Sequence, residues 1–158
     1  MITMKTRLLL TAVLGAAMLN GSANGYADLS ASGGYLTGST ALSGNSAFTI
    51  ELWFNGSNSS QNYARLIGFS SFEFEIAVGQ GSLEVYDGSW RVTGATGLGT
   101  GWHHIAVTND NTNMVVYVDG VQVYTKASAT FNFTGKTMYV GVNKDGSEEL
   151  NGKYDELR

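Results

Sequence analysis

The sequence predicts an all-β domain folded as an antiparallel sandwich or barrel. Apolar and polar residues alternate with a period of two in short segments, and these segments recur about every 8–12 residues. Turn-forming residues separate the segments, because the 158-residue chain has 21 glycines and no proline. After residue 25, no window keeps a helical period of apolar residues over three turns.

The clearest predicted strand covers residues 48–54. Its even-numbered residues are apolar and share one face, whereas Thr49, Glu51 and Trp53 share the other. The same alternation predicts further strands at 72–78, 83–86, 105–107, 115–117, 121–123 and 139–140.

Two Asp-Gly pairs predict hairpins between these strands. A two-residue Asp-Gly link favours a type I′ turn, in which both central residues have positive φ. Asp119-Gly120 connects VVYV to VQVY, and Asp87-Gly88 connects LEVY to SWRV in the same way. The polar segment 109–113 predicts a longer loop.

Composition excludes several classes of function. The net charge of -4 at pH 7 provides no basic surface for nucleic acid. Without cysteine the chain has neither a disulfide framework nor a thiolate metal site, and the redox state of its compartment stays open. The sequence also lacks a Gly-x-Ser-x-Gly nucleophile elbow, a phosphate-binding loop and a dinucleotide fingerprint.

The N-terminal segment 1–16 allows two interpretations. Lys5 and Arg7 precede an apolar stretch at 8–19, and small residues follow, which is the pattern of a cleaved secretory signal. The apolar stretch is shorter than the roughly 20 residues of a membrane span. The alternative is an uncleaved, ordered N-terminal arm.

Five short motifs carry a resemblance to a known family. They are FTIELWF at 48–54, GWHHIAVT at 101–108, VVYVDGVQV at 115–123, MYVGVN at 138–143 and NGKYDELR at 151–158. In this order and spacing they resemble the laminin G-like domains of the concanavalin A-like lectin/glucanase superfamily over residues 17–158. The resemblance implies a jelly-roll sandwich of two antiparallel sheets, working as a binding or adhesion module.

The resemblance also implies that a structural calcium can be held, although no cofactor is required. Calcium takes six to eight oxygen ligands. The candidates are the acidic residues near the C-terminus, Asp145, Glu148, Glu149 and Asp155.

Two acidic residues raise the question of catalysis. Glu73 and Glu75 lie two apart on one predicted strand face, and paired carboxylates can hydrolyse glycosidic bonds. Glucanases of the superfamily place three acids at alternating positions of one strand, but Ser71 and Ala77 occupy the neighbouring positions here. The two glutamates are therefore expected to form a solvated strand face, and no enzyme is predicted.

The two histidines are expected to be structural. His103 and His104 are adjacent in a predicted strand, so they point to opposite faces and cannot both bind one metal. His104 matches the more regular histidine of the family motif, which implies packing and hydrogen bonding.

Aromatic residues provide the candidate binding site. Trp53 and Trp102 are expected to fill the interior of the sandwich, as tryptophans of the family often do. Tyr86 and Trp90, beside a predicted turn, are candidates for stacking on a sugar. Arg91 is the candidate for pairing with a carboxylated or sulfated sugar.

The sequence thus predicts a non-catalytic binding module that recognises a carbohydrate or protein ligand, located outside the cell or on its surface. The alternative is a phage virion structural protein, a capsid decoration or fibre domain that contacts other virion subunits at the virion surface. A glycosidase is the third class, which the number of acids disfavours. Neither a nucleic-acid partner nor a membrane span is expected.

Overall fold

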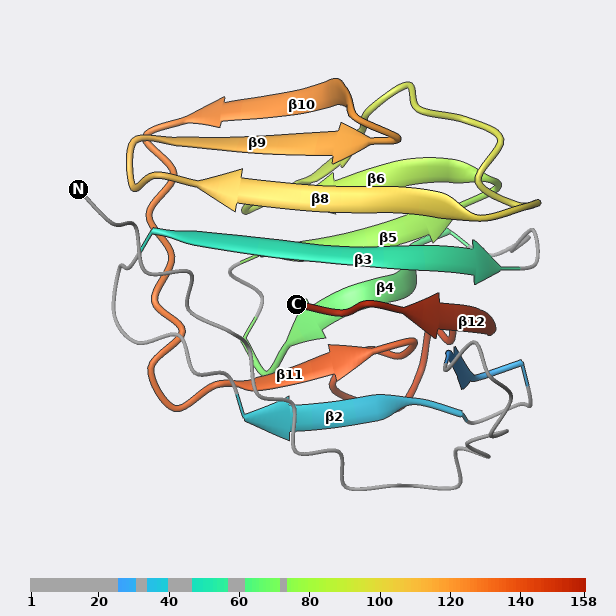
Figure 1. Ribbon diagram of the computed structural model, residues 1–158. Coiled ribbons are helices and arrows are strands. Elements are labelled where there is room, and N and C mark those ends of the chain that lie inside the picture. Colours follow the sequence, from blue (N-terminus) through green and yellow to red (C-terminus); the bar gives the residue numbers. More distant parts are fainter. Residues whose placement is uncertain (1–25, 31–33, 40–46, 57–61, 72–73) are drawn as a thin grey trace.

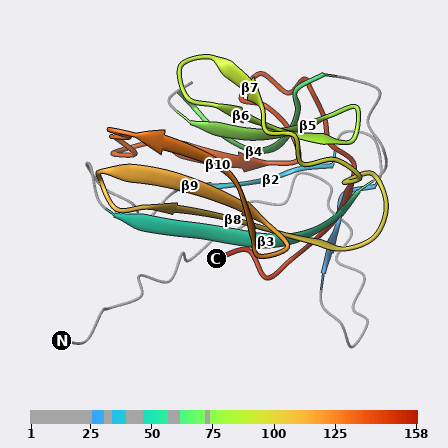
Figure 2. The ribbon, with the colours of Figure 1, turned by 90° about the horizontal axis from the view of Figure 1, so that it is seen from above.

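A computed structural model describes residues 26–30, 34–39, 47–56, 62–71 and 74–158. These residues form two antiparallel sheets of six strands each (Figure 1). The predicted sandwich is therefore confirmed, and Figure 2 shows the sheets as two stacked layers. Within the described residues no helix is long and apolar enough to cross a membrane. The segment 1–16, with its signal or arm interpretation, lies outside the described residues.

Each sheet combines strands from distant parts of the chain. The front sheet, nearer the viewer in Figure 1, has the order β1 (Ala27–Asp28), β12 (Gly152–Asp155), β3 (Phe48–Gly56), β8 (His103–Asn109), β9 (Asn113–Val118), β10 (Val121–Ala127). The back sheet has the order β2 (Leu36–Ser39), β11 (Thr137–Val140), β4 (Ala64–Phe69), β5 (Glu75–Gly79), β6 (Ser82–Tyr86), β7 (Trp90–Val92). In both sheets a C-terminal strand lies between two N-terminal strands, so the ends of the fold are joined through hydrogen bonds.

Strand β3 shows how alternation builds the core. Its four even-numbered apolar residues, Phe48 to Phe54, are at most 7% exposed, while Thr49 and Trp53 lie on the opposite, outward face. Phe48 packs edge-to-face on Phe133, with 5.2 Å between ring centroids. Burying each such phenylalanine contributes about 1.5–3 kcal/mol.

Strands β9 and β10 place their apolar residues differently. The inward residues of β9 are Met114, Val116 and Val118, so the alternating pair Val115 and Tyr117 forms its outward face. Strand β10 is the edge of the front sheet, and Val121 at its start is 65% exposed. Alternation in the sequence predicted these strands, but it did not show which of their two faces packs into the core.

The Asp119-Gly120 hairpin is confirmed. Both residues have positive φ, 50° and 79°, and the flanking Val118 and Val121 are paired, as a two-residue type I′ link requires. The Asp119 carboxylate also accepts the His104 backbone N–H at 2.8 Å, which ties this turn to strand β8.

The second predicted hairpin is wrong in its turn type. Tyr86 pairs with Trp90, so three residues form the link instead of two, and among them Gly88 has positive φ, 107°. A true two-residue link occurs at Gln80-Gly81, between β5 and β6, where both φ angles are positive. Gln-Gly is a less common pair for this turn than Asp-Gly or Asn-Gly, so the hairpin at this position was not predicted.

Candidate functional site

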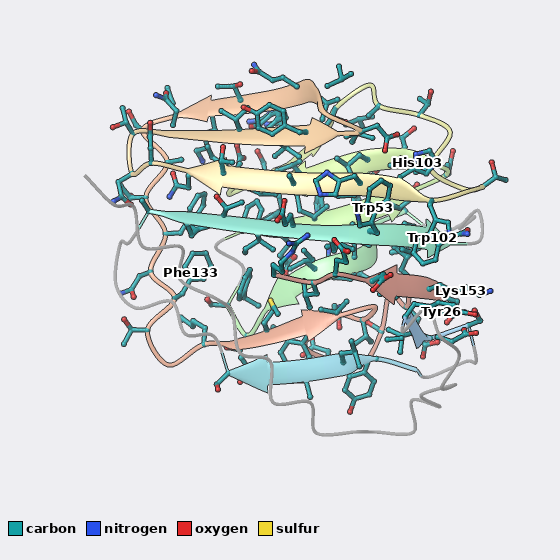
Figure 3. All side chains as sticks on the ribbon, in the orientation of Figure 1. Tyr26, Trp53, Trp102, His103, Phe133 and Lys153 are labelled. Carbon is teal, nitrogen blue, oxygen red and sulfur yellow. The ribbon has the colours of Figure 1, made fainter. Side chains whose placement is uncertain are left out.

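Two tryptophans stand out on the front sheet. Among the described residues, the exposed large hydrophobic side chains are Trp53, Val92, Trp102 and Val121. Trp53 is 38% exposed and Trp102 is 40% exposed, so the expectation that both fill the interior is wrong. Trp53 occupies one of the outward positions of β3. Figure 3 shows both indoles at the outer face of the front sheet.

Polar side chains lie beside Trp53. His104 is its Cα partner on β8, and the centroids of the two rings lie 5.1 Å apart. His104 Nε2 lies 3.5 Å from Glu51 Oε2, and the other carboxylate oxygen of Glu51 lies 3.4 Å from Arg158 Nε. The structure thus agrees with packing and polar contacts for His104, and the charged Glu51 and Arg158 lie beyond it.

Trp102 is connected to the strand β12 side of the face through Tyr26. Their ring centroids are 6.0 Å apart in an edge arrangement, and Lys153 Nζ lies 5.0 Å from the centre of the Tyr26 ring. A cation over an aromatic face is attracted to the ring electrons, so Lys153 and Tyr26 orient one another. Figure 3 shows Trp53, Trp102, Tyr26 and Lys153 along the same end of the front sheet.

A hollow lies beside these aromatic residues, where strands β3 and β12 pair. Its lining is polar apart from two glycines and comprises Ser30, Asn55, Gly56, Asn151, Gly152 and Lys153. Asn55 and Lys153 are Cα partners, and Asn55 lies two positions after Trp53 on the same face of β3. The two glycines contribute backbone alone, so the side-chain functional groups of the hollow are the two amides, the Ser30 hydroxyl and the Lys153 ammonium group.

This face combines the two kinds of group that bind sugars. Flat indole rings offer apolar surface against which the C–H groups of a sugar pack, and amide and ammonium groups hydrogen-bond to hydroxyls. Sequence reasoning did not identify Tyr26, Asn55 or Lys153 as binding residues. For Trp53, the alternation of apolar and polar residues in β3 already indicated a position on the face opposite the core.

The sequence-predicted site lies elsewhere, on the back sheet, and the structure brings only two of its residues together. Tyr86 and Trp90 are Cα partners with ring centroids 5.4 Å apart. Trp90 also stacks on Tyr63, at 4.6 Å and 29°, so part of its ring is already covered. Arg91 is exposed, but it pairs with the core residue Val85 and therefore lies on the opposite side of β7 from Trp90.

Under Trp90 lies a buried charge cluster on the outward side of the back sheet. Arg65 is 2% exposed, and its guanidinium carbon lies 4.7 Å from the Trp90 ring centre. Arg65 Nη1 lies 3.3 Å from Glu75 Oε2, and Nη2 donates to Glu148 Oε2 at 2.5 Å. Glu75 is 0% exposed, so the expected solvated face is wrong for this residue, and Glu73 lies outside the described residues.

Burial gives the Glu75 carboxyl an unusual protonation equilibrium. Burial raises its pKa to about 7, although the charge of Arg65 acts in the opposite direction. Because it is inaccessible, the carboxyl cannot touch a substrate. Its role in this structure is to balance Arg65.

A pH-dependent stability is expected from Glu75. A carboxyl whose pKa rises on folding stabilises the fold fully below its unfolded value, near 4.5, and loses this contribution as the pH rises through about 7. Between pH 4.5 and 8 the free energy of unfolding of the natural protein should therefore decrease. This decrease should be up to about 3 kcal/mol larger than that of the Glu75→Gln variant over the same range. Urea unfolding across this range measures it, with the exposed Glu156→Gln as control. Parallel profiles for all three proteins would contradict the prediction.

His103 is held at the end of the front sheet. Its ring nitrogens lie 2.8 Å from Asp119 Oδ2 and 3.0 Å from the carbonyl oxygen of Thr100. Partial burial lowers the pKa of His103, but the hydrogen bonds to Asp119 and Thr100 outweigh burial, and the net pKa is raised. These contacts anchor the segment that carries Trp102.

The four calcium candidates are not gathered into one site. Glu148 Oε2 accepts hydrogen bonds from Arg65 and Asn143, and Asp145 pairs with Lys144 at 2.6 Å. Asp155 lies on β12 of the front sheet, as the Cα partner of Trp53. In the described part of the chain, no three metal-ligating acids, histidines or cysteines come together. This donor set does not fit a calcium ion, and calcium binding at Asp145, Glu148, Glu149 and Asp155 stays an untested prediction.

Comparison with solved structures shows where this fold occurs. Domain 4 of a GH43 extracellular arabinanase from Geobacillus stearothermophilus, in complex with arabinotriose, matches with a TM-score of 0.66 and 23% identity over 87% of this chain and 71% of that chain. A putative carbohydrate binding protein from Bacteroides ovatus matches with a TM-score of 0.65 and 21% identity, over 78% of this chain and 40% of that chain.

A third similar structure is botulinum neurotoxin type C, whose cell entry depends on interaction with two ganglioside molecules. Its TM-score is 0.68 at 18% identity, over 96% of this chain and 42% of that chain. At these identities the similarities establish the fold. No curated protein sequence matches significantly.

A family model agrees with the architecture. The laminin G-type model of the concanavalin A-like lectin/glucanases superfamily matches residues 29–158, from the end of β1 to the last residue. That range contains all five sequence motifs and eleven of the twelve strands in full. The chain therefore belongs to the concanavalin A-like lectin/glucanases superfamily.

Proposed function

We propose that this chain is a non-catalytic carbohydrate-binding module, and that its binding surface is the outer face of the front sheet around Trp53 and Trp102. The observation that carries the proposal is the exposure of these two indoles on one sheet face, 38% and 40%. Exposed tryptophans beside polar groups are typical of binding surfaces, because each ring loses apolar contact with water when a ligand covers it.

The similar structures support the same class of function. One was solved with arabinotriose, one is a putative carbohydrate binding protein, and one belongs to a toxin that interacts with gangliosides. The first comes from an extracellular enzyme, so location outside the cell or on its surface is part of the proposal. Absence of catalysis is part of it too, since the inaccessible Glu75 is the one described member of the predicted acid pair.

Other ligands and surfaces remain alternatives to this proposal. A protein ligand would use the same exposed indoles. The virion role rests on an N-terminal arm at 1–16, which lies outside the described residues. Tyr86 and Trp90 are an alternative sugar surface, which Trp90→Ala would test in the same binding assay.

The substitutions Trp53→Ala and Trp102→Ala test the proposed surface. Each should weaken glycan binding about 30-fold or more, because loss of a central tryptophan typically costs about 2 kcal/mol or more. Ligands are first identified on a glycan array, and affinities are then measured by isothermal titration calorimetry. Both positions are outward, so the melting temperature should change little.

Val92→Ala and Val121→Ala are matched controls for these variants. Both valines are exposed, at 69% and 65%, and both lie on edge strands away from the indoles. They should bind as the natural protein does. Unchanged glycan affinity in both tryptophan variants would remove this surface as the binding site.

A further inference from the structure

The hollow at the paired ends of β3 and β12 continues the indole surface. Trp53 and Asn55 are outward neighbours on β3, about 7 Å apart along the strand. Lys153 faces Asn55 across the strand pair, and Tyr26 contacts both Lys153 and Trp102. A sugar chain lying on the indoles would therefore place its next unit against the hollow.

The groups that line the hollow suit hydroxyls. Asn55 and Asn151 each offer an amide donor and an amide acceptor, and Ser30 offers a hydroxyl, so one sugar hydroxyl can donate to and accept from the same side chain. The amide oxygen of Asn151 is buried and has no hydrogen-bond partner among the described residues. This buried acceptor belongs to a residue that lines the hollow, but the oxygen itself is not open to solvent.

The charges around this surface disfavour an acidic ligand. Asp28 is the Cα partner of Lys153, and its pKa is lowered, first by hydrogen bonds from Ser30 and also by the charge of Lys153, so it stays ionised. Asp155 flanks Trp53, and Glu51 lies beyond His104. With Lys153 offset by Asp28 and Arg158 paired to Glu51 and Glu156, no net positive surface is left.

We propose that this hollow is a specificity subsite for an uncharged sugar unit, with Asn55 as its main hydrogen-bonding residue, so that the module selects neutral over acidic glycans. The inference rests on the proposed function, because the indoles provide the adjacent contact surface. In this arrangement the tryptophans supply contact area that most sugars share, and the amides select the sugar by its hydroxyl positions. Lys153 donates a hydrogen bond to the uncharged ligand, and its contact with the Tyr26 ring holds it in place.

The test compares neutral oligosaccharides of arabinose, xylose, glucose and galactose with oligosaccharides that carry uronic or sialic acid. Neutral chains should bind, and their dissociation constants should change less than twofold between 50 and 500 mM NaCl. Asn55→Ala should weaken binding of the preferred chain about tenfold. Thr49→Ala, at an exposed outward position earlier on the same strand, is the matched control and should leave binding unchanged.

The outcomes separate this inference from the proposed function. If Trp53→Ala weakens binding and Asn55→Ala does not, the subsite is overturned while the indole surface stands. If acidic chains bind best, with affinity that falls in high salt and is lost in Lys153→Met, the selectivity is overturned. If neither Trp53→Ala nor Trp102→Ala weakens binding, or no glycan binds, the proposed function fails and the subsite fails with it.

Discussion

Replacement of Arg65 by methionine should lower the free energy of unfolding by about 3–5 kcal/mol at pH 8. Arg65 is buried between two carboxylates, and its backbone N–H also donates to the carbonyl oxygen of Glu148 at 2.7 Å. Without the guanidinium, the fully buried Glu75 carboxylate loses its main counter-charge in a site that excludes water, and only the weaker charge of Lys144 still acts on it. The poorly compensated charge is what destabilises the variant, since methionine fills a similar volume.

The loss should depend on pH. At pH 5 the Glu75 carboxyl can bind a proton, so the Arg65→Met variant should lose less stability there, by about 1 kcal/mol or more. Urea unfolding at the two pH values measures this difference, and Arg91→Met, an exposed arginine on the same sheet, is the control. An equal loss at both pH values would show that packing, and not the unpaired carboxylate, is responsible.

Replacement of Gly56 by alanine should also be strongly destabilising, by about 3 kcal/mol, the upper part of the usual range for overpacking. A Cβ at Gly56 would clash with the Cζ atom at the tip of the Phe54 ring, which is 0% exposed and packs on Tyr154 at 5.1 Å. Gly152, its Cα partner, is equally constrained, because a Cβ there would lie 2.8 Å from the Gly56 Cα. Alanine at Gly56 therefore forces the buried ring to move.

A double-mutant cycle tests this cause. In the Phe54→Leu background the added methyl group has space. Gly56→Ala should therefore lower the free energy of unfolding by at least about 1 kcal/mol less in that background than in the natural protein. Free energies of unfolding of all four proteins provide the measurement. Additive losses would mean that the alanine acts through the backbone, without contact with Phe54.

Local signals predicted the parts of the fold that depend on local geometry. The faces of β3 and the Asp119-Gly120 turn agree with the structure, since side-chain alternation and positive φ are properties of neighbouring residues. The link at Asp87-Gly88 differs because its length is set by the pairing of Tyr86 with Trp90, which adds one residue to the turn. Pairing register is a property of two strands and cannot be read from the dipeptide.

The candidate site shows the same division. Alternation separated Trp53 and Glu75 from the apolar faces of their strands, although Trp53 was still expected to fill the interior. The superfamily and the two-sheet sandwich were predicted from the sequence by itself. Only the tertiary structure decided their surroundings. Trp53 is open to solvent, whereas Glu75 is buried beside Arg65, which in turn contacts Trp90 and Glu148. Alternation gives the side of the sheet to which a residue points, but what covers that side comes from segments distant in sequence.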